Sequence, residues 1–320
     1  MTDDLAVAAT WSTPEWRREA TDWLDQSLAA TGLERIGPVA QPHVEPWSTV
    51  LSAETDMGRI WLKAMVPGTA FEIALYDLLV QVEPDHVLHP IASDEERGWL
   101  LLPDGGPSLA ERLTGDELVS AMVGALPQYA FVQRTMTPTT DTIIELGLSD
   151  LRPGVLQARF RDALARLDGE PYADRLRSLE GDFGQWCDVV SRSPLRPTLD
   201  HNDLHPWNIL GGNPTLPGGT GSVVFYDWGD SVVAHPLGSA HIPISRVRRM
   251  VGLDAGHPDV LRMRDAYLEV FTDLVTGPDL IELFEVSCRL ARATRAVVWD
   301  GSPEDVGRYL GDLDDGFGSI

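Results

Sequence analysis

The stretch LDHNDLHPWNIL, residues 199–210, decides how the rest of this chain is interpreted, together with SVVFYDWGD, residues 222–230. The first segment carries the pattern H-x-D-x-x-x-x-N at His201, Asp203 and Asn208. A loop rich in Gly and Pro separates the two segments. Such a short pattern also occurs by chance, so its context has to support any functional interpretation.

The second segment adds a carboxylate at the end of a predicted strand. The apolar run 223–226 predicts a buried strand, and Asp227 follows it directly. Phosphoryl transfer needs metal ions against phosphate oxygens, a carboxylate beside the attacking hydroxyl and a cation on the other phosphates. The amide oxygen of Asn208 and the carboxylate of Asp227 are ligands that suit Mg²⁺, which leaves Asp203 to orient or deprotonate a hydroxyl. Asp230 is a further candidate for the metal shell, or a cap of the following turn.

The two segments resemble the aminoglycoside phosphotransferase and choline kinase family, which contains small-molecule relatives of protein kinases. That family shows H-G-D-x-H-x-x-N followed by D-W-x-x or D-x-G/E. This chain has HNDLHPWN at 201–208 and DWGD at 227–230. Asn202 replaces the usual Gly, which says that the backbone there tolerates a side chain.

The resemblance implies a role for each matching residue. Asp203 is the catalytic base, and His201 is expected to support the loop more than to react. Asn208 and Asp227 hold Mg²⁺ beside the nucleotide, which is ATP or GTP. The implied reaction is transfer of the γ-phosphoryl group to a hydroxyl of a small molecule.

The implied fold is a bilobal, protein-kinase-like α+β fold. A small β-rich nucleotide-binding lobe with a leading helix takes residues 1–103. A larger, mainly helical lobe with the catalytic loop and the substrate cleft takes residues 104–320.

Lys63 is the only lysine in the chain, and it follows the apolar residues 60–62. We interpret it as the strand lysine that contacts the nucleotide phosphates, where a compact ammonium is preferred to a guanidinium. The run 49–55 is expected to pair with 58–65 as two strands, and their short connection lacks the G-x-G-x-x-G of a protein-kinase flap. Glu72 opens an apolar helical run, where it either pairs with Lys63 or simply favours the helix dipole.

Residues 99–106, WLLLPDGG, predict a buried strand that breaks into a turn. In the resembling family this stretch links the lobes and hydrogen-bonds the adenine. Pro103 has no N–H, so we expect the backbone donor at Leu102 or Asp104.

The remaining pattern is mostly helical. Asp182-Phe183-Gly184 falls inside one expected helix and precedes the catalytic loop, so it is not the metal-binding motif of a kinase. A loop is expected at 135–142. Helices are expected at 13–32, 71–82, 108–113, 115–134, 153–167, 176–192, 237–250, 258–274, 279–299 and 303–313.

Composition narrows the class of protein. The 320 residues are 43% hydrophobic and 23% charged, as in ordinary soluble globular proteins. No apolar run reaches the roughly 18 residues of a membrane span, and the first residues are acidic, so a cytoplasmic enzyme is expected. Cys187 and Cys288 are far apart and indicate neither a disulfide framework nor a zinc site.

The formal charge of −24 argues against nucleic acid as a partner. It also favours a cationic small-molecule substrate, although selection for solubility produces the same acidic bias. Two interpretations of the C-terminal residues are open. Trp299, Asp300 and the acidic residues that follow contact an amine of the substrate, or Trp299 belongs to the core and the acidic residues are solvated. Oligomeric state is open.

Two alternatives remain at this point. His205 completes H-x-D-x-H, which a zinc hydrolase could use. A nucleotide-binding protein of the same fold could also sequester a ligand without turnover. The acceptor itself is open among aminoglycosides or other antibiotics, amino sugars, choline-like amines and hydroxy amino acids.

Overall fold

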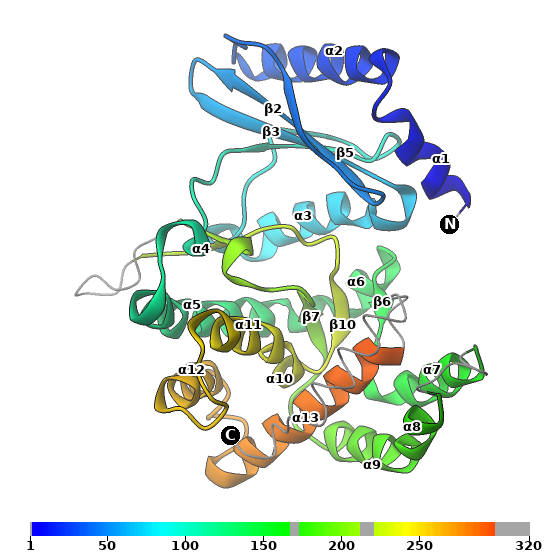
Figure 1. Cartoon of the computed structure of the whole chain (residues 1–320), viewed down its shortest axis with the longest axis vertical. Coiled ribbons are helices and arrows are strands. Elements are labelled where there is room, and N and C mark those ends of the chain that lie inside the picture. Colours follow the sequence, from blue (N-terminus) through cyan, green and yellow to red (C-terminus); the bar gives the residue numbers. More distant parts are fainter. Residues whose placement is uncertain (1, 167–172, 212–220, 298–320) are drawn as a thin grey trace. The chain divides into compact units, whose positions relative to one another are not determined.

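The computed structural model describes residues 2–166, 173–211 and 221–297. The chain forms two compact units (Figure 1). The first contains Met1–Pro107 and Val224–Asp230, and the second contains Ser108–Val223 and Ser231–Ile320. The expected division into lobes after residue 103 stays a prediction, and in this grouping residues 224–230 lie with the first unit. Contacts of Asp227 and Trp228 with residues of that unit, described below, are the physical reason.

A five-stranded antiparallel sheet is the framework of the first unit. Its order is β1-β2-β3-β5-β4. The expected pair is present, and its register runs from Ser48 opposite Met65 to Thr55 opposite Gly58. The strands are β1 (Ala40–Val44), β2 (Ser48–Thr55), β3 (Gly58–Met65), β4 (Ala92–Asp94) and β5 (Trp99–Pro103). The strand β1 was not predicted, because its sequence AQPHV is largely polar and contains a proline.

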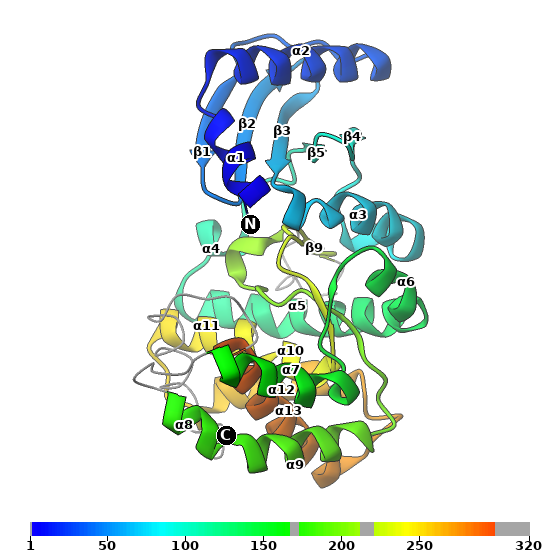
Figure 2. The same ribbon diagram turned by 90° about the vertical axis from the view of Figure 1, so that its right-hand side faces the viewer.

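Three α-helices complete this unit: α1 (Thr2–Thr10), α2 (Pro14–Thr31) and α3 (Phe71–Val82). The helix α2 was predicted closely, since the Thr13 hydroxyl caps it by accepting from Trp16 N–H, and Gly32 ends it at φ 78°. Its apolar face shares one buried cluster of side chains with β2, β3 and β5. Figure 2 shows α2 beside β2 and β3. Two short 3₁₀ turns, η1 (Pro67–Thr69) and η2 (Pro84–His86), and the strand β9 (Val224–Phe225) are also present.

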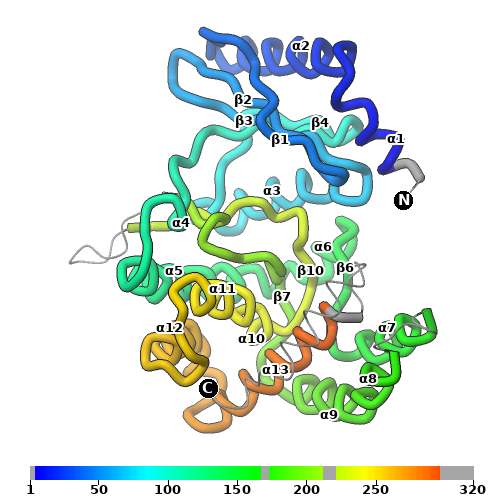
Figure 3. The backbone as a smooth tube through the Cα atoms, in the orientation of Figure 1, coloured from blue at the N-terminus to red at the C-terminus, as the bar shows by residue number. Residues whose placement is uncertain are grey.

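The second unit is mainly helical. Its α-helices are α4 (Leu109–Arg112), α5 (Gly115–Met136), α6 (Thr140–Glu145), α7 (Pro153–Arg166), α8 (Ala173–Ser178), α9 (Glu180–Ser191), α10 (Pro236–Ser239), α11 (His241–Val251), α12 (Pro258–Glu269) and α13 (Gly277–Val297). Helices α7, α9 and α13 pack side by side (Figure 3). Asp182-Phe183-Gly184 lies inside α9, as expected. The helix expected at 303–313 lies outside the described residues.

The loop expected at 135–142 is wrong. Helix α5 continues to Met136, the 3₁₀ turn η3 (Thr137–Thr139) follows, and α6 begins at Thr140. Proline occupies an early position of η3, where a missing N–H costs little. The threonine hydroxyls bond to backbone carbonyls, for example Thr140 to Thr137 at 2.8 Å. Residues typical of turns therefore cap consecutive helical segments here.

A small sheet of order β6-β10-β7 positions the motif at 201–208. It contains β6 (Ser149–Asp150), β7 (Thr198–Asp200) and β10 (Val232–Ala234), with β10 parallel to β6 and antiparallel to β7. The side-chain amide of Gln133, on α5, donates to the backbone carbonyl of Leu199 at 3.0 Å. The backbone carbonyl of Gln133 accepts from the Thr198 hydroxyl at 2.6 Å. Helix α5 therefore fixes the strand from which the motif starts. The 3₁₀ turn η4 (Pro206–Asn208) and the strand β8 (Ile209–Leu210) end the motif.

Candidate functional site

The first unit brings Lys63, Glu72 and Asp227 into direct contact. The Lys63 ammonium, on β3, lies 2.6 Å from a carboxylate oxygen of Glu72 and 2.6 Å from one of Asp227. Glu72 is in the first turn of α3, and Asp227 follows β9. The Glu72 side chain is 1% exposed and that of Lys63 is 17% exposed. The sequence-based pairing of Lys63 with Glu72 is therefore present in the structure.

The two carboxylates keep Lys63 charged. Burial lowers the pKa of Lys63, but the charges of Asp227 and Glu72 outweigh it, so the pKa is raised overall. Burial also raises the pKa of Glu72, and this effect exceeds the opposing effect of the Lys63 charge. The other oxygen of Glu72 accepts from the N–H of Trp228 at 2.9 Å, so the carboxylate is anchored at both oxygens.

The backbone after β9 has an unusual conformation that serves this contact. Asp227 has φ 65°, in the left-handed region that non-glycine residues rarely enter. A Cβ at Gly229 would come within 3.1 Å of a Glu72 oxygen and 3.5 Å of the Lys63 nitrogen. Glycine at 229 therefore makes room for the ion pair, a role that the D-W-G sequence alone did not reveal.

In the second unit, the loop after β7 organises Asp203 and Asn208. The N–H of Asp203 donates to the carbonyl of His201 at 2.8 Å, and the N–H of Asn208 donates to that of His205 at 2.8 Å. The side-chain amide of Asn208 donates to the carbonyl of Asp203 at 3.1 Å. This bond commits the amide nitrogen to the loop and leaves the amide oxygen as the atom that suits a hard cation.

Asp203 is held as a carboxylate. One of its oxygens lies 3.4 Å from Nε2 of His205, and its side chain is 31% exposed. Burial raises the pKa of Asp203, but the hydrogen bond and charge of His205 outweigh it, so the pKa is lowered. The group is therefore ionised at neutral pH and able to accept a proton.

Buried groups behind the loop fix its backbone. The hydroxyl of Tyr129, on α5, accepts from the N–H of His201 at 2.9 Å. The carboxylate of Asp200 accepts from the N–H of Asn202 at 2.8 Å and from the hydroxyl of Ser239. Burial raises the pKa of Asp200 despite these bonds. His201 is fully buried, and its expected supporting role stays a prediction.

The backbone conformation and contacts of Asn202 account for an asparagine at the position where the resembling family has glycine. Its φ is 60°, the left-handed region where Gly is preferred and Asn is tolerated better than most residues. Its side-chain oxygen accepts from the guanidinium of Arg295 at 2.6 Å, and its carbonyl accepts from the same group. Sequence analysis missed Tyr129 and Arg295, because both lie in helices whose patterns indicate only packing.

The segment expected to contact adenine is partly used within the sheet. The N–H of Asp104 donates to the carbonyl of Arg59 at 3.0 Å, and Leu102 lies opposite Trp61. The side chain of Asp104 accepts from the N–H of Gly106 at 2.9 Å. The nucleotide contacts of Leu102 and Asp104 stay predictions, as does the metal-shell role of Asp230. Trp299, Asp300 and the acidic C-terminal residues lie outside the described residues.

The described residues contain no group of three or more His, Cys, Asp or Glu side chains placed to share a metal ion, so the zinc alternative at His205 gains no support. In the same part of the chain, every helix is too short or too polar to cross a bilayer.

Comparison with known proteins identifies the fold. No protein-family model matches the sequence, and no curated protein matches it either. Among solved structures, macrolide 2'-phosphotransferase MphH from Brachybacterium faecium is 16% identical, with a TM-score of 0.56 over 92% of this chain and 98% of that one. Choline kinase LicA from Streptococcus pneumoniae is 13% identical, with a TM-score of 0.58 over 93% and 100%.

A third structure, the GDP and kanamycin complex of APH(2")-IIia, is 13% identical, with a TM-score of 0.59 over 92% and 97%. At these identities the likeness shows a shared fold. The protein-kinase-like α+β fold implied by the sequence motifs is therefore confirmed, and the neighbours that share it include kinases and phosphotransferases of small molecules.

Proposed function

We propose that this chain transfers the γ-phosphoryl group of ATP or GTP to a hydroxyl of a small molecule. The contact of Lys63 with Asp227, at 2.6 Å and across 164 residues of sequence, is the observation that carries the proposal. Protein kinases use a strand lysine paired with a helix glutamate, and a later aspartate that binds Mg²⁺, beside the nucleotide phosphates. Lys63, Glu72 and Asp227 are the residue types that this arrangement requires. The bound GDP in one structural neighbour supports a nucleotide co-substrate.

Each residue then has a role that its surroundings support. Lys63 binds phosphate oxygens, and Glu72 holds its ammonium in place. Asp203, ionised and beside His205, accepts the proton of the attacking hydroxyl. The hydroxyl oxygen forms a bond to the γ-phosphorus as the bond to the bridging oxygen breaks, and ADP or GDP leaves.

The oxygen donors present suit Mg²⁺. Asn208 offers an amide oxygen whose partner nitrogen is already bonded, and Asp227 offers a carboxylate. These two residues would hold the ion, which neutralises charge on the phosphates when bound. Binding of Mg²⁺ by these oxygen atoms needs neither a thiolate nor an imidazole ligand.

Nucleotide consumption with purified protein tests the proposal. We expect ADP or GDP to form in the presence of Mg²⁺ and a suitable hydroxyl compound from a broad panel. Asp203→Asn should abolish this turnover while nucleotide binding, measured by calorimetry, is retained. Wild-type protein that binds Mg-nucleotide but consumes none with any compound of the panel would instead support the sequestering alternative.

A further inference from the structure

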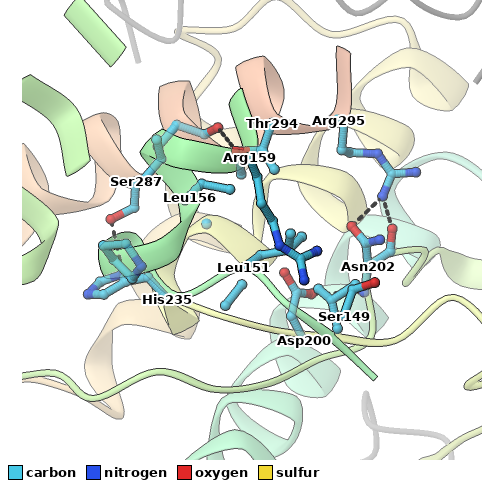
Figure 4. Close-up of a pocket in the computed structure, with 16 residues that line it drawn as sticks. Ser149, Leu151, Leu156, Arg159, Asp200, Asn202, His235, Ser287, Thr294 and Arg295 are labelled. Carbon is cyan, nitrogen blue, oxygen red and sulfur yellow. Dashed lines mark hydrogen bonds between the residues drawn. The ribbon is translucent and has the colours of Figure 1, made fainter. Parts of the chain in front are cut away.

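A cavity in the second unit adjoins the loop that carries Asp203 (Figure 4). Its empty volume is about 680 Å³, including solvent at its mouth. Asp200 and Asn202, which flank His201 in the same loop, form part of its wall. The remaining walls come mainly from α7, β10 and α13. The cavity therefore lies beside the loop that carries Asp203, although Asp203 itself is not among the lining residues.

Most of the wall is apolar. The apolar side chains include Leu151, Leu156, Val232, Ala234, Leu290 and Ala291. His235 also lines the cavity, and burial lowers its pKa to about 3, so it is neutral at physiological pH. A ligand of this cavity therefore needs a substantial apolar body.

The charged groups of the wall are two arginines and one aspartate. The carboxylate of Asp200 is buried and already accepts from Ser239 and Asn202. Among the described lining residues, no other carboxylate is present to pair with an ammonium group. A cationic ligand would therefore be desolvated beside two guanidinium groups, with only the already hydrogen-bonded Asp200 carboxylate to offset them.

Arg159, on α7, is a positively charged group of the wall that could bind an anionic ligand. Its side chain extends into the cavity towards the loop of Asp200 and Asn202 (Figure 4). Within the described part of the chain, its guanidinium makes no ion pair or hydrogen bond. Arg295, on the neighbouring wall, already donates to Asn202. A guanidinium in this position can bind a carboxylate through two parallel hydrogen bonds.

We propose that this cavity binds the phosphate acceptor, and that the acceptor is an apolar hydroxyl compound carrying a carboxylate rather than an amine. That the ligand is the phosphate acceptor rests on the proposed function. The charge preference of the cavity does not depend on the proposed function. A carboxylate-bearing acceptor differs from the cationic substrate that the net charge of −24 favoured. The charges that line a site, rather than the net charge of the chain, decide which ligand it accepts.

Binding of three matched probes tests the preference. The probes are para-(hydroxymethyl)benzoate, para-(hydroxymethyl)benzamide and para-(hydroxymethyl)benzylamine, which share one skeleton and differ in charge. Their affinities for the full-length protein are measured by ligand-observed NMR without nucleotide, so turnover is not required. We expect the benzoate to bind most tightly and the benzylamine most weakly.

Variants assign the preference to Arg159. Arg159→Gln should weaken benzoate binding by about tenfold and leave the benzamide nearly unchanged, because a charge-assisted bond is lost. Arg161→Gln is the matched control, since Arg161 lies on the same helix and pairs with Glu180 at 3.0 Å. Tightest binding by the benzylamine, no binding of the benzoate, or an unchanged benzoate affinity in Arg159→Gln would overturn the inference. Absent turnover with intact benzoate binding would instead count against the proposed function alone.

Discussion

Lys63 neutralises two carboxylates, one of them almost fully buried. Lys63→Met would leave Glu72 charged inside the first unit, where the Trp228 N–H is its remaining partner among the residues that the structure describes. We expect a loss of about 3 kcal/mol in the free energy of unfolding, because removing one partner strands a buried charge. The midpoint of urea unfolding measures this loss.

The double variant Lys63→Met, Glu72→Gln is the control for this prediction. It should recover part of the lost stability, because the buried charge is then absent, while nucleotide turnover stays abolished. A single variant with an unchanged midpoint and normal turnover would contradict the electrostatic account of Lys63.

The pH dependence of activity should depend on His205. His205→Ala removes the contact that lowers the pKa of Asp203, so burial should then raise that pKa. The acidic limb of kcat/KM should move to higher pH, and His205→Gln should restore it in part by donating a hydrogen bond. Rates measured from about pH 4 to 8, a range that begins near the usual pKa of an aspartate, check this shift. An acidic limb at the same pH in all three proteins would rule out the role of His205.

The same lowered pKa affects stability. Because the folded-state pKa of Asp203 lies below its unfolded value, the carboxylate contributes stability above the unfolded pKa. That contribution is lost as the pH falls through the folded pKa. In His205→Ala, where burial raises the folded-state pKa of Asp203, the acid destabilisation from this residue should therefore shrink or disappear.

At the residue scale, the pairing of Lys63 with Glu72 was predictable from the sequence. Lys63 was recognised because it is the only lysine and follows a predicted strand. The contact of Gly229 with the ion pair was not predictable, since it depends on a backbone path that brings two distant segments together. Arg159 also carried no signal, because an exposed arginine on a helix resembles any solvated residue.

Among the elements, α5 has a function beyond packing. Tyr129→Phe would leave the N–H of His201 without its acceptor in a buried environment. We expect a cost of about 1–3 kcal/mol in stability, and a fall in kcat of about tenfold because the Asp203 loop shifts.

Tyr267→Phe provides a matched control on α12. The Tyr267 hydroxyl is equally buried and bonds to Gln133 and to the carbonyl of Pro236, not to the Asp203 loop. It should lose similar stability but retain more of its kcat, because the Tyr267 hydroxyl is connected to the motif through Gln133 and β7. Equal kcat values in the two variants would show that Tyr129 is only structural.

Element boundaries were predictable where caps were local, as for α2 with Thr13 and Gly32. They failed at 135–142, where threonine and proline suggested a loop. There the hydroxyl of Thr140 also bonds to the carbonyl of Pro197, a contact between segments distant in sequence. Tertiary contacts of this kind override local turn signals.

At the scale of the whole molecule, ligand binding should be linked to stability. Mg²⁺ with nucleotide should raise the free energy of unfolding by about 2.7 kcal/mol at a hundredfold excess over Kd. Asn208→Ala and Asp227→Ala should each remove the part that depends on Mg²⁺. Thermal unfolding with nucleotide, with and without EDTA, separates that part. A metal-dependent gain that survives in both variants would mean that other residues hold the ion.

The two-unit organisation was only partly predictable. A linear division placed residues 224–230 with the second lobe, because neighbours in sequence usually share a domain. The structure groups them with the first unit through contacts such as Trp228 with Glu72, 156 residues apart. No local pattern in the sequence encodes such a pairing.

Transfer of a phosphoryl group from the nucleotide to a carbon-bound hydroxyl is tested most directly by mass spectrometry of acceptor compounds after incubation with the protein, Mg²⁺ and ATP or GTP. We expect an acceptor carrying one added phosphoryl group, formed by the wild type and not by Asp203→Asn. Release of inorganic phosphate alone, with every acceptor in the panel unmodified, would contradict the proposed transfer.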